Sequence, residues 1–183
     1  METIRTNQLK DNINQTVKVN GWVYNSRCSG KISFLMLRDG FSIIQCIISI
    51  DDVGEEKFEE FKTYTQESSL SVIGKVVEND RAPGKSEIIV EDINLIHLSI
   101  DYPITPKEHG PDFLMNNRHL WLRSKRQHAI IKIRHQIIKA TRDFFDSNEF
   151  TLVDTPIFTP NAAEGSTTLF ETEYFGQDRK SVV

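Results

Sequence analysis

An aromatic ring and an amide stand on two neighbouring segments that are predicted to be strands, Phe34 in I-S-F-L-M-L-R-D and Gln45 in I-I-Q-C. Asp39-Gly40 between them is a strong signal for a two-residue hairpin turn, which would place Phe34 directly opposite Gln45. Only a register slip by an odd number of residues would put them on opposite faces. A ring can stack on an unpaired nucleobase, and an amide can both donate to and accept from its edge. The pattern therefore fits a site for single-stranded nucleic acid. It fits equally well a structural interpretation, in which a neighbouring loop covers Phe34 and Gln45 is a solvated edge residue.

A second candidate group is the carboxylate of Glu164, in the segment N-A-A-E-G-S-T-T-L-F-E. Small residues flank it on both sides, a composition typical of a mobile lid over a substrate site. The alternative interpretation is a loop carboxylate beside a turn glycine.

The histidines and cysteines lack the spacing of a metal site. His128 and His135 are seven residues apart, too far for two ligands on adjacent helical turns. Cys28 and Cys46 show neither metal spacing nor a disulfide framework, and we interpret both as small buried thiols. The sequence also lacks a Ser-His-Asp pattern and a glycine-rich phosphate loop. We therefore predict no metal ligand in this chain.

Composition and charge limit the class of protein. Hydrophobic residues make up 38% and charged residues 26% of the 183 residues, as in soluble globular proteins. The net charge of −4 argues against a protein that coats nucleic acid by charge alone. Residues 117–142 hold eight basic and no acidic side chains, and we favour a solvated helix face over a phosphate-binding stripe there. No apolar run is long enough to span a membrane and no signal peptide begins the chain, so we expect a cytoplasmic protein.

Alternating apolar and polar residues predict five strands in the first hundred residues, with one helix after the third strand. The expected strands cover 17–24, 32–38, 42–49, 69–78 and 87–98, the last bent near Asp92, and the expected helix covers 54–66. This order is that of the OB-fold, a five-stranded barrel that commonly binds single-stranded nucleic acid. The side chains expected inside the barrel include Leu35, Leu37 and Ile44, and those expected on its outer face are Phe34, Met36, Ile43 and Gln45.

A different pattern follows a proline-rich hinge at 101–112. Apolar residues at helical spacing predict one long helix, which begins near Lys125 after a capping box of Ser124 and Gln127. Asn148 is expected to end this helix in the left-handed conformation. Residues 150–153 are expected to form a short strand, and Pro156 after it suits a sheet edge or an interface.

The long helix followed by E-F-T-L-V-D-T-P resembles motif 1 of the class II aminoacyl-tRNA synthetases. The segment around Glu164 resembles the substrate loop of the asparaginyl and archaeal-type aspartyl members, and F-L-M-N-N-R-H-L-W-L-R resembles the entry to their catalytic domain. The resemblance covers essentially residues 15–176. It implies a multi-domain fold: an OB-fold anticodon-binding domain at 1–100, the hinge at 101–112, and the start of an α+β antiparallel-sheet catalytic domain at 113–177.

The resemblance also implies roles for individual residues. In the class IIb synthetases (aspartyl, asparaginyl and lysyl), an aromatic on one barrel strand and a glutamine on the next recognise the central uridine of the anticodon. Phe34 and Gln45 match these positions, and Arg27, in the turn before the second strand, matches a basic residue that contacts the anticodon backbone. Glu164 matches a glutamate that helps to hold the α-ammonium group of the amino acid. Pro156 matches the proline of motif 1, which builds the dimer interface.

The activity implied by the resemblance is that of an asparagine–tRNA ligase, a homodimer that activates asparagine with ATP and Mg²⁺ and transfers it to tRNA. The alternatives are an aspartyl-tRNA synthetase, including the non-discriminating kind, and a free-standing OB-fold RNA-binding module. The residues of motifs 2 and 3 that bind ATP and magnesium are expected outside this chain, so the chain alone is expected to be inactive. The ending D-R-K-S-V-V departs from the family pattern and equals the translation of a common sequencing adapter, so we interpret 178–183 as non-native.

Overall fold

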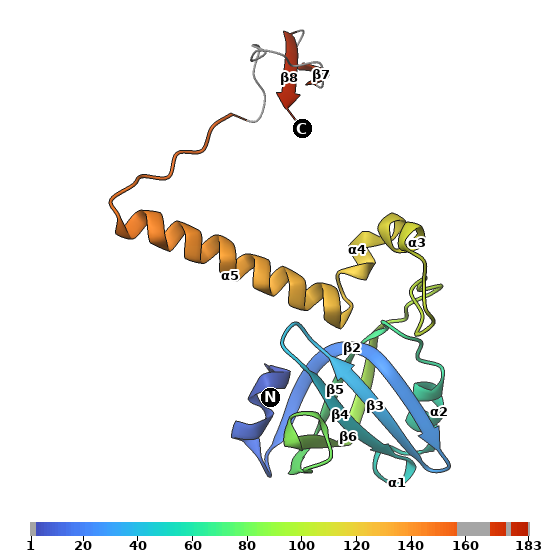
Figure 1. Ribbon diagram of the computed structural model, residues 1–183. Coiled ribbons are helices and arrows are strands. Elements are labelled where there is room, and N and C mark those ends of the chain that lie inside the picture. Colours follow the sequence, from blue (N-terminus) through green and yellow to red (C-terminus); the bar gives the residue numbers. More distant parts are fainter. Residues whose placement is uncertain (1–2, 157–168, 175–176, 183) are drawn as a thin grey trace. The chain divides into compact units, whose positions relative to one another are not determined.

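A computed structural model describes residues 3–156, 169–174 and 177–182 (Figure 1). The chain divides into two compact units, Met1–Asn117 and Arg118–Val183. The first unit contains a β-barrel, and the second contains a long helix and a two-stranded sheet.

Five strands close into the barrel of the first unit. They are β2 (Thr16–Ser29), β3 (Ile32–Arg38), β4 (Ile43–Ser49), β5 (Ser69–Glu78) and β6 (Ser86–His97). Neighbouring strands pair in the order β2-β3-β4-β6-β5, and β5 pairs again with β2, so that the strands enclose a common interior (Figure 1). β4 and β6 run parallel, whereas the other barrel pairs are antiparallel. This topology confirms the predicted OB-fold.

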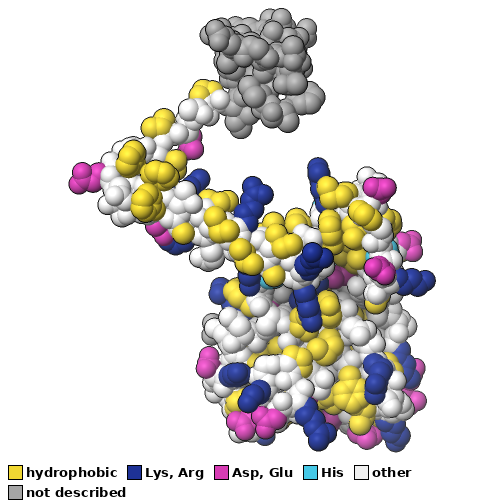
Figure 2. All heavy atoms as spheres, in the orientation of Figure 1, with side chains coloured by type: hydrophobic (Ala, Val, Ile, Leu, Met, Phe, Trp, Pro, Cys, Tyr) yellow, Lys and Arg dark blue, Asp and Glu magenta, His cyan; other side chains and the backbone are white. Residues whose placement is uncertain are grey.

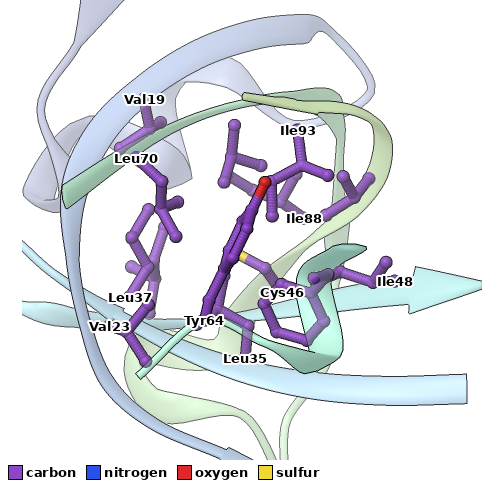
Figure 3. Close-up of a cluster of buried hydrophobic side chains, with 14 of the residues drawn as sticks. Val19, Val23, Leu35, Leu37, Cys46, Ile48, Tyr64, Leu70, Ile88 and Ile93 are labelled. Carbon is purple, nitrogen blue, oxygen red and sulfur yellow. The ribbon is translucent and has the colours of Figure 1, made fainter. Parts of the chain in front are cut away.

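The strand alternation directs one set of side chains into the barrel. Leu35, Leu37 and Ile44, which were predicted to point inward, are at most 2% exposed. Figure 3 shows two of them, Leu35 and Leu37, in the same cluster as Cys46 and Tyr64. The predicted outer-face residues are all half-buried: Phe34, Met36, Ile43 and Gln45. The division between the two faces is therefore as predicted.

β2 is longer than its predicted range. It pairs with β5 over Thr16–Trp22 and with β3 over Trp22–Ser29, with a bulge between Val23 and Asn25. The turn after it contains only Gly30 and Lys31, and Gly30 takes a φ of 61° that favours glycine. Arg27 consequently lies in a strand and not in the predicted turn. The run N-S-R-C-S is exposed throughout and has no buried face. Its sequence therefore lacks the apolar–polar alternation from which a strand could have been predicted.

The β3–β4 hairpin has a four-residue loop, residues 39–42, where two residues were predicted. Arg38 pairs with Ile43 and Met36 with Gln45, so the prediction that Gln45 lies directly opposite Phe34 is wrong. The slip is two residues, and both side chains stay on the outer face. The physical cause is the Asp39 carboxylate, which accepts hydrogen bonds from the N–H groups of Phe41 (2.7 Å) and Ser42 (3.0 Å) and so widens the turn.

The helical segment after β4 consists of two short helices, α1 (Ile50–Val53) and α2 (Glu55–Lys62), where one helix over 54–66 was predicted. Gly54 separates them with a φ of 83°. The side chains of Phe58 and Phe61 in α2 are 1% exposed and belong to the barrel core.

β5 and β6 form the longest antiparallel pair of the barrel. Ile73 pairs with Asp92 and Gly74 with Val90, which leaves Glu91 as the extra residue of a bulge and confirms the predicted bend near Asp92. A side chain on Gly74 would meet the main chain, because a Cβ there would lie 2.1 Å from the carbonyl oxygen of Ile89. The short 3₁₀ helix η2 (Pro83–Lys85) lies in the loop between the two strands.

The N-terminal segment also packs on the barrel. β1 (Thr3–Ile4) pairs in parallel with β2, and the 3₁₀ helix η1 (Thr6–Asn12) follows it. Leu9 of η1 is 1% exposed in the core, and Thr6 is 3% exposed beside the β3–β4 loop.

Helices α3 (Pro111–Asn116), α4 (Arg118–Trp121) and α5 (Lys125–Ser147) follow the barrel in sequence. The predicted start of the long helix is confirmed: α5 begins at Lys125, and the Ser124 hydroxyl accepts a hydrogen bond from the Gln127 N–H at 3.5 Å. Its apolar side chains are exposed along the helix (Figure 2).

The end of α5 differs in detail from the prediction. Asn148 has a φ of −102°, and the left-handed residue is Glu149, with a φ of 66°. The N–H of Glu149 donates to the carbonyl of Asp146, and the N–H of Phe150 donates to that of Phe145, both at 3.1 Å. This is a Schellman motif, in which glutamate occupies the position that glycine usually takes.

The predicted strand at 150–153 is absent. Residues 150–156 are irregular and pair with none of the described strands. A strand requires a neighbour for its N–H and C=O groups, and β-propensity alone does not supply one. Strands β7 (Leu169–Tyr174) and β8 (Gln177–Val182) pair with each other in antiparallel orientation.

Candidate nucleic-acid interface

A hollow of about 270 Å³ lies on the outer face of the barrel. Three strands contribute its lining residues: Asn25, Ser26 and Arg27 from β2, Phe34 and Met36 from β3, and Gln45 from β4. The three barrel residues singled out by the sequence, Arg27, Phe34 and Gln45, are therefore brought together at one site.

Arg27 and Phe34 form the first half of the hollow. They pair directly across β2 and β3, and the guanidinium carbon of Arg27 lies 5.9 Å from the centre of the Phe34 ring. This distance is within the range of a cation–π contact. The ring is half-buried and the guanidinium is exposed, so the pair offers a stacking surface with a positive charge beside it.

Gln45 forms the second half, and its amide has a fixed orientation. The amide nitrogen Nε2 donates to Oε2 of Glu87 at 2.8 Å. An ionised carboxylate only accepts hydrogen bonds, so the nitrogen must face Glu87. The carbonyl oxygen Oε1 is then the atom that Gln45 can offer as an acceptor to a ligand in the hollow.

Glu87 is a part of the site that the sequence did not reveal. It is 8% exposed, and its Oε2 also accepts from Nδ2 of Asn79 at 2.9 Å. Gln45 and Glu87 pair across the parallel strands β4 and β6, although they are far apart in the chain. The signal that could have drawn attention to Glu87 is a lone charge at the start of the apolar strand S-E-I-I-V. Met36, Asn25 and Ser26 were also missed as lining residues.

The two cysteines occupy different environments. Cys46 is fully buried, and burial together with the nearby negative charge of Glu87 raises the pKa of its thiol well above the usual value. Cys28 is exposed, so the interpretation that both are buried thiols is wrong for Cys28. Its sulfur accepts a hydrogen bond from the Ser33 hydroxyl at 2.8 Å. Cys28 lies on the polar end of β2, where no side chain enters the core.

The remaining predicted site residues belong to the second unit. Pro156 is exposed in the irregular segment after α5. Glu164 lies outside the described residues. Within the part of the chain that the structure describes, no three His, Cys, Asp or Glu side chains gather closely enough to hold a metal ion. None of the described helices combines the length and the apolarity needed to cross a membrane.

Two family models match the chain. The OB-fold nucleic acid binding domain matches residues 17–96, and the model of tRNA synthetases class II (D, K and N) matches residues 110–180. The first match covers the barrel except for the first residue of β2 and the last residue of β6, and it includes every residue that lines the hollow.

Individual proteins of known identity are also similar. An asparagine–tRNA ligase of Sorangium cellulosum (strain So ce56) is 52% identical over 175 residues, which cover 95% of this chain and 39% of that protein. The crystal structure of asparaginyl-tRNA synthetase from Pyrococcus horikoshii complexed with asparaginyl-adenylate matches with a TM-score of 0.90 and 33% identity, over 99% of this chain and 42% of that one. The Entamoeba histolytica asparaginyl-tRNA synthetase in complex with asparaginyl-adenylate matches with a TM-score of 0.78 and 26% identity, over 98% and 42%. The chain thus spans about two-fifths of the length of these relatives.

Proposed function

Because the chain belongs to the asparaginyl-tRNA synthetase family of class II enzymes, we propose that the whole protein is an asparagine–tRNA ligase and that the barrel binds the anticodon of its tRNA. The observation that carries the anticodon proposal is the hollow itself, in which a stacking ring, a guanidinium and an oriented amide come from three neighbouring strands. Such a combination suits an unpaired base with its adjoining phosphate.

We assign the central uridine of the anticodon to this hollow. The base stacks on Phe34, and its N3–H donates to Oε1 of Gln45, the acceptor that the Glu87 hydrogen bond leaves available. Cytosine carries an acceptor in place of that N–H, so it would leave the Gln45 oxygen and its own ring nitrogen facing each other. Arg27 contacts the phosphate backbone beside the stacked base.

The chemical step is proposed for the whole protein and not for this chain. The asparagine carboxylate attacks the α-phosphate of ATP to form an adenylate and releases pyrophosphate. A hydroxyl at the 3′ end of the tRNA then takes the asparaginyl group and releases AMP. Mg²⁺ would offset the negative charge of the phosphates. Support comes from the asparaginyl-adenylate in the complexes of two relatives. We propose that Glu164 holds the α-ammonium group of asparagine and that the protein acts in the cytoplasm. Among the described residues, no three His, Cys, Asp or Glu side chains gather closely enough to hold a cation.

We further propose that the whole protein is a homodimer, in which α5 and Pro156 lie at the interface. Ile133 and Ile137 of α5 are both 61% exposed, which suits a surface covered by another subunit. The charges of the helix give a second argument. Lys125 and Arg126 occupy the first turn and Asp146 the last, the reverse of what the helix dipole favours. Two antiparallel α5 helices would pair the basic end of one with the acidic end of the other.

The anticodon proposal is tested by binding the chain to stem-loops that carry G-U-U or G-C-U. Stacking on one aromatic contributes about 1–3 kcal/mol, so Phe34→Ala should weaken binding to the G-U-U loop by roughly tenfold. Phe41→Ala is the matched control, because Phe41 is an exposed phenylalanine of the same hairpin that does not line the hollow. Equal binding of both loops by the wild-type chain, with no effect of Phe34→Ala, would reject the proposal.

The catalytic proposal needs the whole protein and a separate assay. Exchange of pyrophosphate into ATP should depend on asparagine and not on aspartate. Exchange that responds to aspartate alone would identify an aspartyl enzyme, and no exchange with either amino acid would leave the RNA-binding module as the better description.

A further inference from the structure

We propose that Asp39 and Thr6 are positioning residues for base recognition, because together they hold the β3–β4 hairpin in the register that sets the Gln45 amide relative to the Phe34 ring. The inference rests on the proposed function of the hollow and explains how its two halves are aligned. Neither residue touches the hollow itself.

The contacts converge on the Asp39 carboxylate. Oδ2 accepts from the Thr6 N–H at 2.9 Å, and Oδ1 accepts from the Thr6 hydroxyl and from the N–H groups of Phe41 and Ser42. The Thr6 hydroxyl oxygen in turn accepts from the Ser42 hydroxyl at 2.8 Å. Thr6 is almost fully buried and Asp39 is half-buried, so η1 and the hairpin loop are joined by a network that is partly shielded from water.

The alternation of side chains does not by itself select this register. A slip of two residues leaves every inward side chain of β3 and β4 pointing inward, because side chains alternate with a period of two. Asp39-Gly40 is itself suited to a two-residue turn, which would produce that slip. The four-residue loop is therefore favoured by the hydrogen bonds of Asp39, and half of these come from Thr6, which lies 33 positions away in the chain.

The register matters because each half of the hollow is tied to a different neighbour. Phe34 pairs with Arg27 on β2, and Gln45 pairs with Glu87 on β6. β3 and β4 are the strands between these two pairs. A two-residue slip between them would displace one pair against the other by roughly 7 Å. The slip would place the ring and the amide directly opposite each other, and the amide oxygen would lose the offset from the ring that it has in the present register.

The test compares Asp39→Ala and Thr6→Val in the full chain, with Asp52→Asn as the control at an exposed aspartate of α1. The first readout needs no RNA. Cross-strand proton contacts by NMR should join Met36 and Gln45 in the wild-type chain, and contacts between Phe34 and Gln45 should appear in Asp39→Ala. Unchanged wild-type contacts in both variants would overturn the proposal.

The second readout is the ratio of affinities for the G-U-U and G-C-U stem-loops. We expect this ratio to fall by about fivefold to tenfold in Asp39→Ala and by less in Thr6→Val, whereas Asp52→Asn keeps the wild-type ratio. A purely structural role would lower the melting temperature and leave the ratio of the folded variants intact, which would also overturn the proposal.

The two readouts separate this inference from the proposed function. If the wild-type chain does not distinguish the two loops, the assignment of the hollow fails, while the NMR contacts still decide whether Asp39 sets the register. If Asp39→Ala does not fold, Thr6→Val decides, because it removes one hydroxyl and keeps the side-chain volume. A wild-type ratio and wild-type contacts in folded Thr6→Val would then reject the proposal.

Discussion

The barrel and α5 place their apolar side chains in opposite ways. The barrel closes on itself, and its inward-facing leucine, isoleucine and valine side chains are almost completely buried (Figure 3). α5 carries an apolar stripe just as regular, yet all of its large apolar side chains are exposed in the described structure. A barrel satisfies its own strand edges, whereas one amphipathic helix must find another surface. The first region thus buries its own apolar side chains, whereas the apolar face of α5 is left uncovered among the described residues.

The largest expected effect concerns barrel closure. Gly74→Ala places a methyl group against the Ile89 carbonyl, and we expect a loss of about 3 kcal/mol or more in the free energy of unfolding. Gly40→Ala is the control, because a Cβ at Gly40 meets no atom within 4 Å. Chemical denaturation of both variants measures the difference. Equal midpoints would show that the barrel can open at this bulge without cost.

A pair of truncations tests the contrast between the two regions. Leu35→Ala should cost about 2–5 kcal/mol of stability, since Leu35 is completely buried. Ile137→Ala should change the stability by no more than about 0.5 kcal/mol, because the side chain is 61% exposed. It should instead weaken self-association, which sedimentation velocity measures. If Ile137→Ala lowers the melting temperature as much as Leu35→Ala does, the contrast is wrong.

The end of α5 allows a gain of stability. Glu149 holds a left-handed conformation that costs a non-glycine residue about 1–2 kcal/mol, so Glu149→Gly should strengthen the helix end by roughly 1 kcal/mol. The control Asn148→Gly should bring no such gain in stability, because Asn148 has a negative φ. Amide hydrogen exchange in the last turn of α5 measures both. Slower exchange in both variants, or in neither, would contradict the assignment of the Schellman motif.

The smallest effect is a pH dependence of the barrel. Burial raises the pKa of Asp39, but the hydrogen bonds from Thr6, Phe41 and Ser42 outweigh it, and the pKa lies below its usual value. Asp39 therefore stabilises the fold above the unfolded pKa, and this contribution disappears as the pH falls through the lower folded value. Asp39→Asn should flatten the acid limb of a stability–pH curve. An unchanged acid limb would show that the carboxylate is not ionised in these contacts.

The bounds of the strands could be predicted from the sequence more accurately than the register in which the strands pair. Strands at 32–38 and 69–78 were predicted with the observed bounds, because each is a short run rich in apolar residues between turn residues. The hairpin register was wrong by two residues, since it depends on Thr6, a residue distant in the chain that shows no pattern linking it to Asp39. Glu87 was missed for the same reason: its partner Gln45 becomes a neighbour only when β4 and β6 pair.

Two other errors have local causes. Cys28 was expected to be buried, but the end of β2 has no core on either side, so its residue type says nothing about its exposure. Residues 150–153 have strand-forming side chains, but none of the described strands pairs with them. The outer-face placement of Phe34 and Gln45 was correct because it depends only on the parity of the register.

The strand order of the barrel has a consequence for its synthesis. β6 lies between β4 and β5, so the barrel cannot close before His97 has been made, whereas β2, β3 and β4 can pair as soon as they emerge. Ribosomes add about 5–20 residues per second, so the three-stranded sheet waits several seconds with an open edge. During that interval β2 exposes the edge that will later receive β5. Lys18 and Asn20, on the outward face of β2, place a charged and a polar side chain along that edge. Such side chains disfavour pairing of the open edge with strands of other chains during synthesis.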